Sequence, residues 1–471
     1  MQVISGNKFA FLVGSGLIFT FLPYLFLPRL TGEHLPFFLV CFSLAGVAYL
    51  LAIRRLCRSP FPVRTIWIVA ILARLIVLWT SPSLSNDVYR YLWDGHLLHQ
   101  GISPYAEPVS SPELDAHSTP LRQNVNHAEM ASPYLPAAQA YFWFMEWIAP
   151  QQVKVYQLAA TLFDLLTGLL ILQILSRLKL NPSAVVIYLW NPLVIVEFAH
   201  SAHVDAWMLF LFMLAIYISL SFPKKHLAAP FLFALATLTK GVPALLVPIF
   251  FRRWRLSGIV LYLLSTGLPL VFLGLITGWG LGQQMDGRGL FGAIRVYAQF
   301  WEFNASPLFE FVSAWPVGNH EIANRLARIL TGLIVLFTVV WSARKAWRLG
   351  QLDPDPIKGG RVLVRLSILP VGIYLLLSPT VHPWYVTWVI PLIPFFIPAK
   401  GEPARIWRWA IPWICFTITV AYSYLAYLSP GKSEVPIWVL WMEYLILYAS
   451  LAWASLPYWR LLAKHNRVEP V

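Results

Sequence analysis

The sequence predicts an all-α polytopic membrane protein, and three observations support this fold class. Of its 471 residues, 58% are hydrophobic and only 12% are charged. Apolar stretches of about 17–23 residues recur along the chain, and this length lets a helix cross a bilayer. The links between them are short and carry Arg or Lys, which is typical of cytoplasmic loops. We therefore expect a single membrane domain over residues 1–471, without a separate soluble domain.

About 12 spans are expected from hydropathy. The first apolar run has no small-residue cleavage site, so we expect it to be retained rather than removed as a signal peptide. With the N-terminus inside, the loop of residues 82–152 lies outside. The basic groups that set this orientation are Arg54, Arg55, Arg58 and Arg64, Lys224 and Lys225, Arg252, Arg253 and Arg255, and Arg344, Lys345 and Arg348. The expected spans are 9–28, 36–53, 65–81, 153–176, 184–199, 206–221, 257–277, 324–343, 362–378, 384–398, 409–427 and 437–457.

Two segments must not cross if every basic loop is to lie inside. Residues 133–149 are short and aromatic, and we expect them to form a helix along the outer interface. Residues 228–250 are expected to form a broken hairpin with its tip at residues 239–243, although a single span is the alternative. Lys240 is then an intramembrane cation and a functional candidate, with a snorkelling lysine as the structural alternative.

The net charge of +14 and the three cysteines exclude several classes of function. The positive charge lies in the cytoplasmic links, so a nucleic-acid partner is not expected. The cysteines form no CxxC pair and have no His partner, so neither a structural metal nor a disulfide framework is indicated.

The predicted topology places the unusual polar groups on the outer side. In the stretch of residues 85–96, Asp87, Arg90 and Asp94 share one face of a helix. One-sided polar groups suggest chemistry at the outer face, whereas a transporter should place them near the midplane and show repeats. The other outer groups are His203 and Asp205, the loop 279–322 with Arg288, Arg295, Glu302 and Asn304, and the segment 378–385 with His382, Trp384 and Tyr385.

Group transfer from a lipid-anchored phosphate donor fits these residues best. Motifs for nucleotide binding, zinc proteolysis and serine hydrolysis are absent from the sequence, and a nucleotide sugar would be cytoplasmic. The reaction needs a base for the acceptor hydroxyl and cations for the departing phosphate. Asp87 is the candidate base, with a membrane-edge salt bridge as its alternative. The candidate phosphate contacts are Arg90, Lys240, Arg288, Arg295 and His382.

Other outer-face residues have two interpretations each. Asp205 precedes an apolar run and is either a site residue or a helix cap. A divalent cation held by Asp87 or Asp94 with His203 is an open alternative, but no metal or cofactor is firmly implied. Trp384, like Tyr89, Trp93, Tyr105 and Trp301, either stacks on a sugar or belongs to the interfacial aromatic belt.

With these residues assembled, the chain resembles the GT-C superfamily of integral-membrane glycosyltransferases. It is most similar to the bacterial polyprenol-phosphate-mannose-dependent α-mannosyltransferases, and more distantly to the mannosyltransferase that adds the first mannose of GPI. The matching stretches are Asn86-Asp87-Val88-Tyr89-Arg90-Tyr91-Leu92-Trp93-Asp94-Gly95, Gly101-Ile102-Ser103-Pro104-Tyr105, Trp190-Asn191-Pro192-Leu193, His203-Val204-Asp205-Ala206, Leu238-Thr239-Lys240-Gly241, Trp301-Glu302-Phe303-Asn304 and His382-Pro383-Trp384-Tyr385.

The resemblance implies a GT-C helical bundle with the catalytic Asp, here Asp87, in the first large extracytoplasmic loop. It also implies a polyprenyl-phosphate-linked sugar donor, a lipid or glycan acceptor and inversion at the anomeric carbon. The site then faces the periplasm or exterior from a bacterial inner membrane. Asn86 stands where some relatives carry an acid. The alternative function is a transporter or flippase of a lipid-linked or small polar substrate, which Lys240 favours, and a further alternative is an inactive scaffold of an envelope-assembly complex.

Overall fold

The computed structural model describes residues 6–57, 60–222, 227–282, 285–315, 319–352, 355–428 and 434–465. The described chain is helical, and the extended pairing within it is one isolated bridge between Phe303 and Thr380. The prediction of an all-α polytopic membrane protein is therefore confirmed. Arg58, Lys224 and Lys225, which entered the topology argument, lie outside the described residues.

The N-terminal part consists of three long helices followed by the predicted outer loop. The three helices are α1 (Gly6–Phe21), α2 (Leu35–Leu56) and α3 (Val63–Leu78). The loop contributes α4 (Asp87–His99) and α5 (Pro136–Ile148), and α6 (Val153–Arg177) follows it. Because α5 has 13 residues, it is too short to cross a bilayer, as the interfacial interpretation requires.

Broken helices form the middle of the chain. The helices α7 (Val186–Leu189) and α8 (Pro192–Ile195) belong to a pair bent by 60°, because Asn191 caps the second helix and Pro192 lacks an N–H. Then come α9 (Asp205–Ser221), α10 (Ala228–Thr239) and α11 (Val247–Thr277). The chain breaks at Lys240, where the backbone is extended, and α11 is kinked at Arg255. The break expected at residues 239–243 is thus present.

The C-terminal part combines long helices with short, proline-rich ones. Its elements are α12 (Gly292–Phe300), α13 (Pro307–Ser313), α14 (His320–Leu352), α15 (Pro356–Leu366), α16 (Ile368–Leu377), α17 (Pro383–Val386), α18 (Ile411–Thr419) and α19 (Ile437–His465). A 3-10 helix, Ile390–Phe396, continues from α17, and another, Val420–Leu428, continues from α18.

Fewer helices pass a length test than the 12 expected spans. Among the described residues, eight helices are long and apolar enough to cross a membrane, or up to nine with the bent pair. The expected spans 65–81 and 206–221 correspond to α3, with 16 residues, and α9, with 17 residues. Prolines break the expected span 384–398 into α17 and a 3-10 helix.

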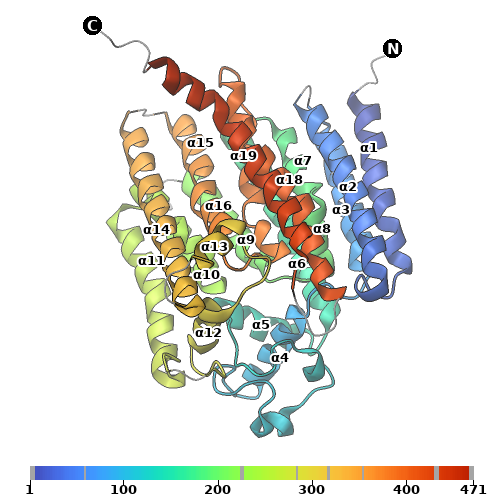
Figure 1. The fold of residues 1–471 in the computed structure, drawn as a ribbon, viewed down its shortest axis with the longest axis vertical. Coiled ribbons are helices and arrows are strands. Elements are labelled where there is room, and N and C mark those ends of the chain that lie inside the picture. Colours follow the sequence, from blue (N-terminus) through green and yellow to red (C-terminus); the bar gives the residue numbers. More distant parts are fainter. Residues whose placement is uncertain are drawn as a thin grey trace.

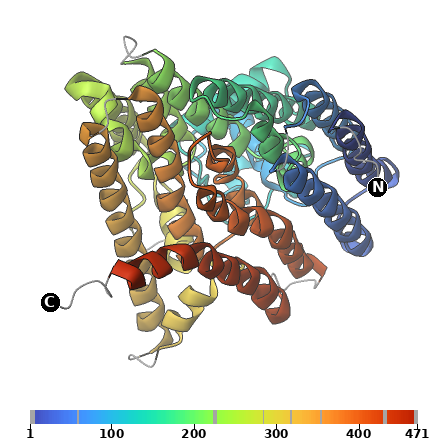
Figure 2. The same ribbon diagram turned by 90° about the horizontal axis from the view of Figure 1, so that it is seen from above.

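The loop elements gather at one end of the bundle. Figure 1 shows α4, α5 and α12 at the end opposite to the two chain termini. Seen from above, α1 to α3 lie at the edge of the bundle far from α11 and α14 (Figure 2). Gly95 lets α4 pack closely on α5, since an added Cβ would lie 2.6 Å from the carbonyl oxygen of Phe142. This packing fixes where α4 begins, and therefore where Asp87 lies.

Candidate active site

A cavity of about 1120 Å³ opens beside the start of α4. Its wall is assembled from segments far apart in the sequence, including residues 81–87, residues 133–135 and residues 239–242. Ligand pockets usually measure roughly 300–1,000 Å³, so this space is large enough for a small-molecule ligand. The predicted site residues in this wall are Asp87, Arg90, Lys240, His382, Trp384 and Tyr385.

Asp87 is the first residue of α4 and presents its carboxylate to the cavity. The side chain is 16% exposed, and the amide of Asn126 donates a 2.9 Å hydrogen bond to its Oδ1. Its Oδ2 lies 3.7 Å from Nδ1 of His203. The N-terminal end of a helix favours a negative charge, so the start of α4 suits a carboxylate.

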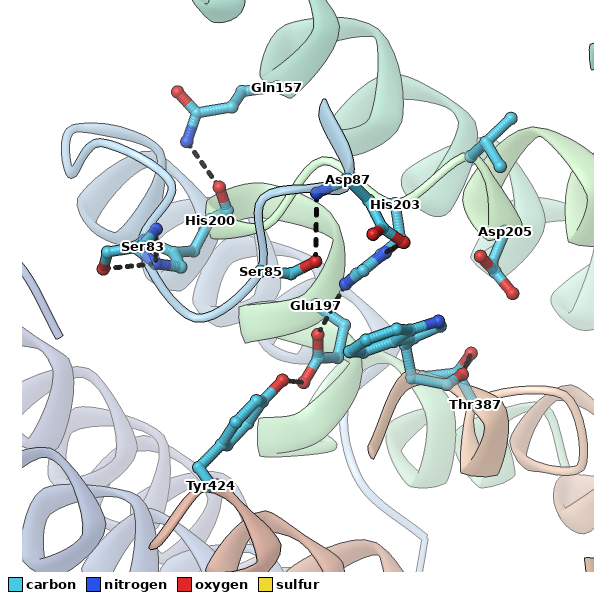
Figure 3. Close-up of polar contacts among 12 residues, drawn as sticks. Ser83, Ser85, Asp87, Gln157, Glu197, His200, His203, Asp205, Thr387 and Tyr424 are labelled. Atoms are coloured by element: carbon cyan, nitrogen blue, oxygen red, sulfur yellow. Dashed lines mark hydrogen bonds and ion pairs between the residues drawn. The ribbon is translucent and has the colours of Figure 1, made fainter. Parts of the chain in front are cut away.

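His203 lies between two carboxylates, as Figure 3 shows. Its Nε2 is 3.3 Å from Oε2 of Glu197, and both side chains are fully buried. Glu197 is held in turn by Tyr424, whose hydroxyl donates a 2.6 Å hydrogen bond to Oε1. Asp87, His203, Glu197 and Tyr424 therefore form a continuous line of polar groups leading away from the cavity.

The backbone around His203 is irregular and tightly held. A π-helical turn spans Val196–His200, and Ala202 has a φ of 58°. His200 is fixed by Thr80 and Ser83, at 2.6 Å and 3.1 Å, so it anchors the segment and does not reach the cavity wall. Distorted backbone of this kind persists only where its surroundings hold it, and it is frequent at functional sites.

Lys240 and Asp205 form a second buried pair at the cavity. Nζ of Lys240 donates to both carboxylate oxygens of Asp205, at 2.9 and 2.8 Å, and the indole of Trp388 also donates to Asp205. Nζ also lies 5.0 Å from the ring centre of Tyr385. Lys240 is 21% exposed whereas Asp205 is fully buried, so the ammonium group faces the cavity with a counter-ion behind it.

A stack of rings forms the wall next to this pair. Trp384 lies between His203 and His382, with ring centres 4.2 and 4.4 Å away. His382 in turn stacks on Phe303 at 4.5 Å. Tyr385 is joined to Tyr297 by a 2.6 Å hydrogen bond between their hydroxyls. These contacts hold the predicted aromatic residues in place and leave their edges to the cavity.

Arg90 and Asp94 build the loop behind the site. The guanidinium of Arg90 donates to the backbone carbonyls of Asn126, His127 and Met130, at 2.7 to 3.0 Å. It thereby fixes the segment that brings Asn126 to Asp87. Asp94 is buried and accepts hydrogen bonds from Ser132 and Gln139. Burial raises the pKa of Asp94 to about 6, although Arg90 opposes the shift.

Besides Asp94, His203 and Asp205, four more predicted residues lie outside the cavity lining. Arg288 pairs with Glu107 and Asp286, at 2.7 and 2.9 Å. Arg295 donates to the carbonyl of Gly280 and to Gln299, and Glu302 pairs with Arg328. Asn304 donates to Glu443 at 2.8 Å. The structure thus joins these residues to neighbouring protein groups and does not bring them to Asp87.

Comparison with known proteins assigns this chain to a family. Residues 19–255 match the family profile described as alpha-(1->6)-mannopyranosyltransferase, N-terminal domain. The chain belongs to this mannosyltransferase family. The matched residues include Asp87, Glu197, His203 and Lys240, and the resemblance to GT-C mannosyltransferases is confirmed.

Two curated relatives carry the name alpha-(1->6)-mannopyranosyltransferase A. The protein from Corynebacterium glutamicum is 25% identical over 185 residues, covering 36% of this chain and 35% of the relative. The protein from Mycobacterium tuberculosis is 23% identical over 413 residues, covering 76% of this chain and 75% of the relative. The first match thus covers about a third of that relative's length. No solved structure matches the chain significantly.

Several residues at the site were not predicted from the sequence. Glu197 is a lone acid inside the expected span 184–199. Because burying an acid in a membrane is costly, its presence there was a signal of function that the sequence offered. Asn126, Tyr297 and Tyr424 carry no such signal, because polar loop residues and aromatic residues are common in this chain. Arg29, which also lines the cavity, lies just after the first expected span.

The alternative of a bound divalent cation requires several carboxylate and imidazole side chains to lie close together. In the part of the chain that the structure describes, no three His, Cys, Asp or Glu side chains form a group suited to a metal ion. Asp94 points to Ser132 and Gln139, so it does not join His203.

Proposed function

We propose that this protein is a glycosyltransferase that moves mannose, or another hexose, from a polyprenyl-phosphate donor to a lipid or glycan acceptor. The observation that carries the proposal is the pairing of two opposite groups on one cavity wall. The Asp87 carboxylate is partly exposed and backed by His203, and the Lys240 ammonium is partly exposed and backed by Asp205. A base and a cation facing the same space are what glycosyl transfer from a phosphate requires.

In the proposed reaction, Asp87 removes the proton of the acceptor hydroxyl. The acceptor oxygen then forms a bond to the anomeric carbon, and the bond from that carbon to the phosphate oxygen breaks. The leaving polyprenyl phosphate keeps the electron pair, and Lys240 stabilises its added negative charge. A single displacement of this kind inverts the anomeric carbon.

An apolar groove beside the cavity supports a lipid-linked donor. The groove has a volume of about 500 Å³ and is lined by α5, α6, α9 and α10. Leu235 lines the groove and Thr239 lines the cavity, and these residues are one turn apart on α10. A phosphate in the cavity and an isoprenoid chain in the groove would therefore lie on adjacent turns of one helix.

We also propose that the site faces the outside of a bacterial inner membrane. The elements α4, α5 and α12 lie at the end of the bundle away from the chain termini, as an outward-facing loop requires (Figure 1). A polyprenyl-linked sugar can reach such a site from within the bilayer. The feature that favoured a transporter, Lys240, has a buried counter-ion, Asp205, behind the cavity wall.

The test is transfer of radiolabelled mannose from polyprenyl-phosphate-mannose to extracted membrane lipids by purified protein. Wild type should transfer the label, and Asp87→Asn should lose more than about a hundredfold, the scale of a general base. The matched control is Asp115→Asn, a 70% exposed carboxylate of the same loop, which should keep wild-type transfer. A nucleotide sugar should not replace the donor. Equal transfer by wild type and Asp87→Asn would contradict the assignment of Asp87 as the base.

A further inference from the structure

His203 and Glu197 carry buried polar atoms that lack conventional hydrogen bonds. Both ring nitrogens of His203 and Oε2 of Glu197 are without a hydrogen-bond partner among the described residues, although the side chains are fully buried. Buried polar groups are normally satisfied, so such exceptions need an explanation. Here the atoms face one another at 3.3 Å, and the far ring nitrogen faces Asp87 at 3.7 Å.

The contacts around these two residues fix their directions. Tyr424 donates to Oε1 of Glu197, which turns Oε2 toward the imidazole. The ring of His203 lies against Trp384, with 4.2 Å between centres and 21° between planes. The backbone N–H of His203 also donates to the carbonyl of Glu197. The imidazole therefore presents Nε2 to Glu197 and Nδ1 to Asp87.

We propose that Glu197 is a positioning residue that keeps the imidazole proton of His203 on Nε2. Nδ1 then offers its lone pair to Asp87 and receives the proton that Asp87 has taken from the acceptor. This inference rests on the proposed function, because it assigns the next step to the proton that Asp87 removes. A carboxylate that sets the tautomer of a histidine is a known arrangement in other enzymes.

The proton transfer balances and regenerates the base. Asn126 donates to Oδ1 of Asp87 and Oδ2 is the oxygen that faces His203, so the proposed route takes the acceptor proton through Oδ2. It then moves from Oδ2 to Nδ1 of His203, which leaves Asp87 as a carboxylate and His203 as an imidazolium. The imidazolium lies between Asp87 and Glu197, so two negative charges stabilise it. It loses the proton to water in the cavity, through Asp87, before the next turnover.

Several other charged or titratable groups surround the imidazole. They are His200 on its own segment, the pair of Asp205 and Lys240 from α9 and the end of α10, His382 beyond Trp384, and Tyr424 beyond Glu197. The decisive variant should therefore change Glu197 and leave these groups intact.

Glu197→Gln is the decisive variant because it keeps the shape and reverses the hydrogen-bond preference. The amide oxygen can still accept from Tyr424, and the NH₂ group then faces Nε2 and favours a proton on Nδ1. We expect kcat to fall about 10- to 100-fold, at or below the lower end of general-base effects because Asp87 itself is retained, with KM for the donor nearly unchanged. The loss should shrink as the pH rises, because Asp87 then releases its proton to solvent more readily.

The matched control is Glu443→Gln, which changes another fully buried glutamate. Glu443 accepts a hydrogen bond from the amide of Asn304, and both residues lie outside the cavity lining. Its pH profile should coincide with that of wild type. Tyr424→Phe, which removes only the hydrogen bond to Glu197, should give a smaller decrease in kcat than Glu197→Gln. A fall in kcat for Glu443→Gln as large as that for Glu197→Gln would overturn the proposal.

A second readout does not depend on activity. Nitrogen-15 NMR of histidine-labelled protein, with His203 assigned through His203→Gln, reports which ring nitrogen carries the proton. We expect Nε2–H in wild type and Nδ1–H in Glu197→Gln. Nδ1–H in wild type would overturn the proposal whether or not sugar is transferred. If wild type transfers sugar through Asp87 but Glu197→Gln keeps its kcat and pH profile, the proposed function stands and this inference fails.

Discussion

Two buried ionic groups in this bundle differ in how completely they are satisfied. Between α3 and α6, Arg74 pairs with Asp164, and both side chains are fully buried. The guanidinium also donates to the carbonyls of Ala70 and Leu189, at 3.1 and 2.9 Å. At the cavity, Asp87 is partly exposed and the imidazole of His203 lacks conventional partners. A fully hydrogen-bonded ion pair that no ligand can reach is suited to holding helices together. A pair with unsatisfied hydrogen-bonding groups beside a cavity is suited to chemistry.

The comparison has a physical basis. Both groups must offset the cost of removing charge from water, and a buried pair does so only with good geometry and further hydrogen bonds. Arg74 and Asp164 use their hydrogen-bonding capacity within the protein. Asp87 and Lys240 each keep a face toward the cavity, so a ligand can complete their interactions.

The largest effect is expected from breaking the fully hydrogen-bonded pair of Arg74 and Asp164. Asp164→Leu leaves Arg74 charged and unpaired in the bundle, which should cost about 3–5 kcal/mol of stability. Thermal melting in detergent checks this. The double variant Arg74→Met/Asp164→Leu should recover most of the loss, because no charge is then left without a partner. A single variant that melts like wild type would contradict the structural role.

Asp94 gives a pH-dependent test of a third buried group, one that lies outside the cavity. Because burial raises its pKa from 3.8 to about 6, the folded loop retains a proton that the unfolded chain loses between these values. Its contribution to stability is therefore greatest below pH 4 and falls as the pH rises toward 6. The shift corresponds to up to about 3 kcal/mol.

Asp94→Asn should remove this dependence, since an amide does not ionise. We expect the melting temperature of wild type, relative to that of Asp94→Asn, to fall between pH 4 and pH 7. A difference that stays constant over this range would show that the ionised carboxylate is not disfavoured in the folded loop.

Lys240→Ala tests the ionic pair at the cavity. The change removes a cation that faces the cavity and leaves Asp205 without its ionic partner. A hydrogen bond to a charged group contributes about 1.5–3 kcal/mol, so kcat/KM for the donor should fall about 10- to 100-fold. Steady-state kinetics over a range of donor concentrations measures this. Lys240→Arg keeps the charge and should lose less, and an unchanged kcat/KM in Lys240→Ala would place the phosphate elsewhere.

The smallest effect is expected at Arg288. Its partners lie outside the cavity lining and its side chain is 45% exposed, so the ion pairs are screened by solvent. Arg288→Ala should change stability by less than about 1 kcal/mol and transfer by less than about twofold. A large loss of transfer would return Arg288 to the site, as a phosphate contact of the kind first expected from the sequence.

The fold could be predicted from the sequence to the extent that hydropathy and charge determine it. The length of the apolar runs predicts the membrane helices, and the position of basic residues predicts the break at Lys240. The sequence does not predict how short or bent a segment is. The bend between α7 and α8 depends on how Asn191 caps the second helix within the packed bundle.

The candidate site was predictable only in part. A sequence shows which polar side chains are costly to bury in a membrane, but it does not show which partners they contact in the fold. Asp87, Lys240 and His382 were visible as polar groups at membrane boundaries, and the structure brings all three to one cavity. Arg295 and Asn304 looked similar in sequence, but their side chains bond to other parts of the protein. Glu197 was visible as an acid in an apolar run, whereas its contact with His203 exists only in three dimensions.

The most direct test compares mannose transfer per folded molecule in Asp87→Asn and Asp164→Asn. We predict that Asp87→Asn folds normally and loses more than about a hundredfold in transfer, the scale of a general base. We predict that Asp164→Asn gives less folded protein, but that each folded molecule transfers sugar within a few-fold of wild type. Equal losses per folded molecule, or a greater loss in Asp164→Asn, would contradict the division between a structural pair and a catalytic one.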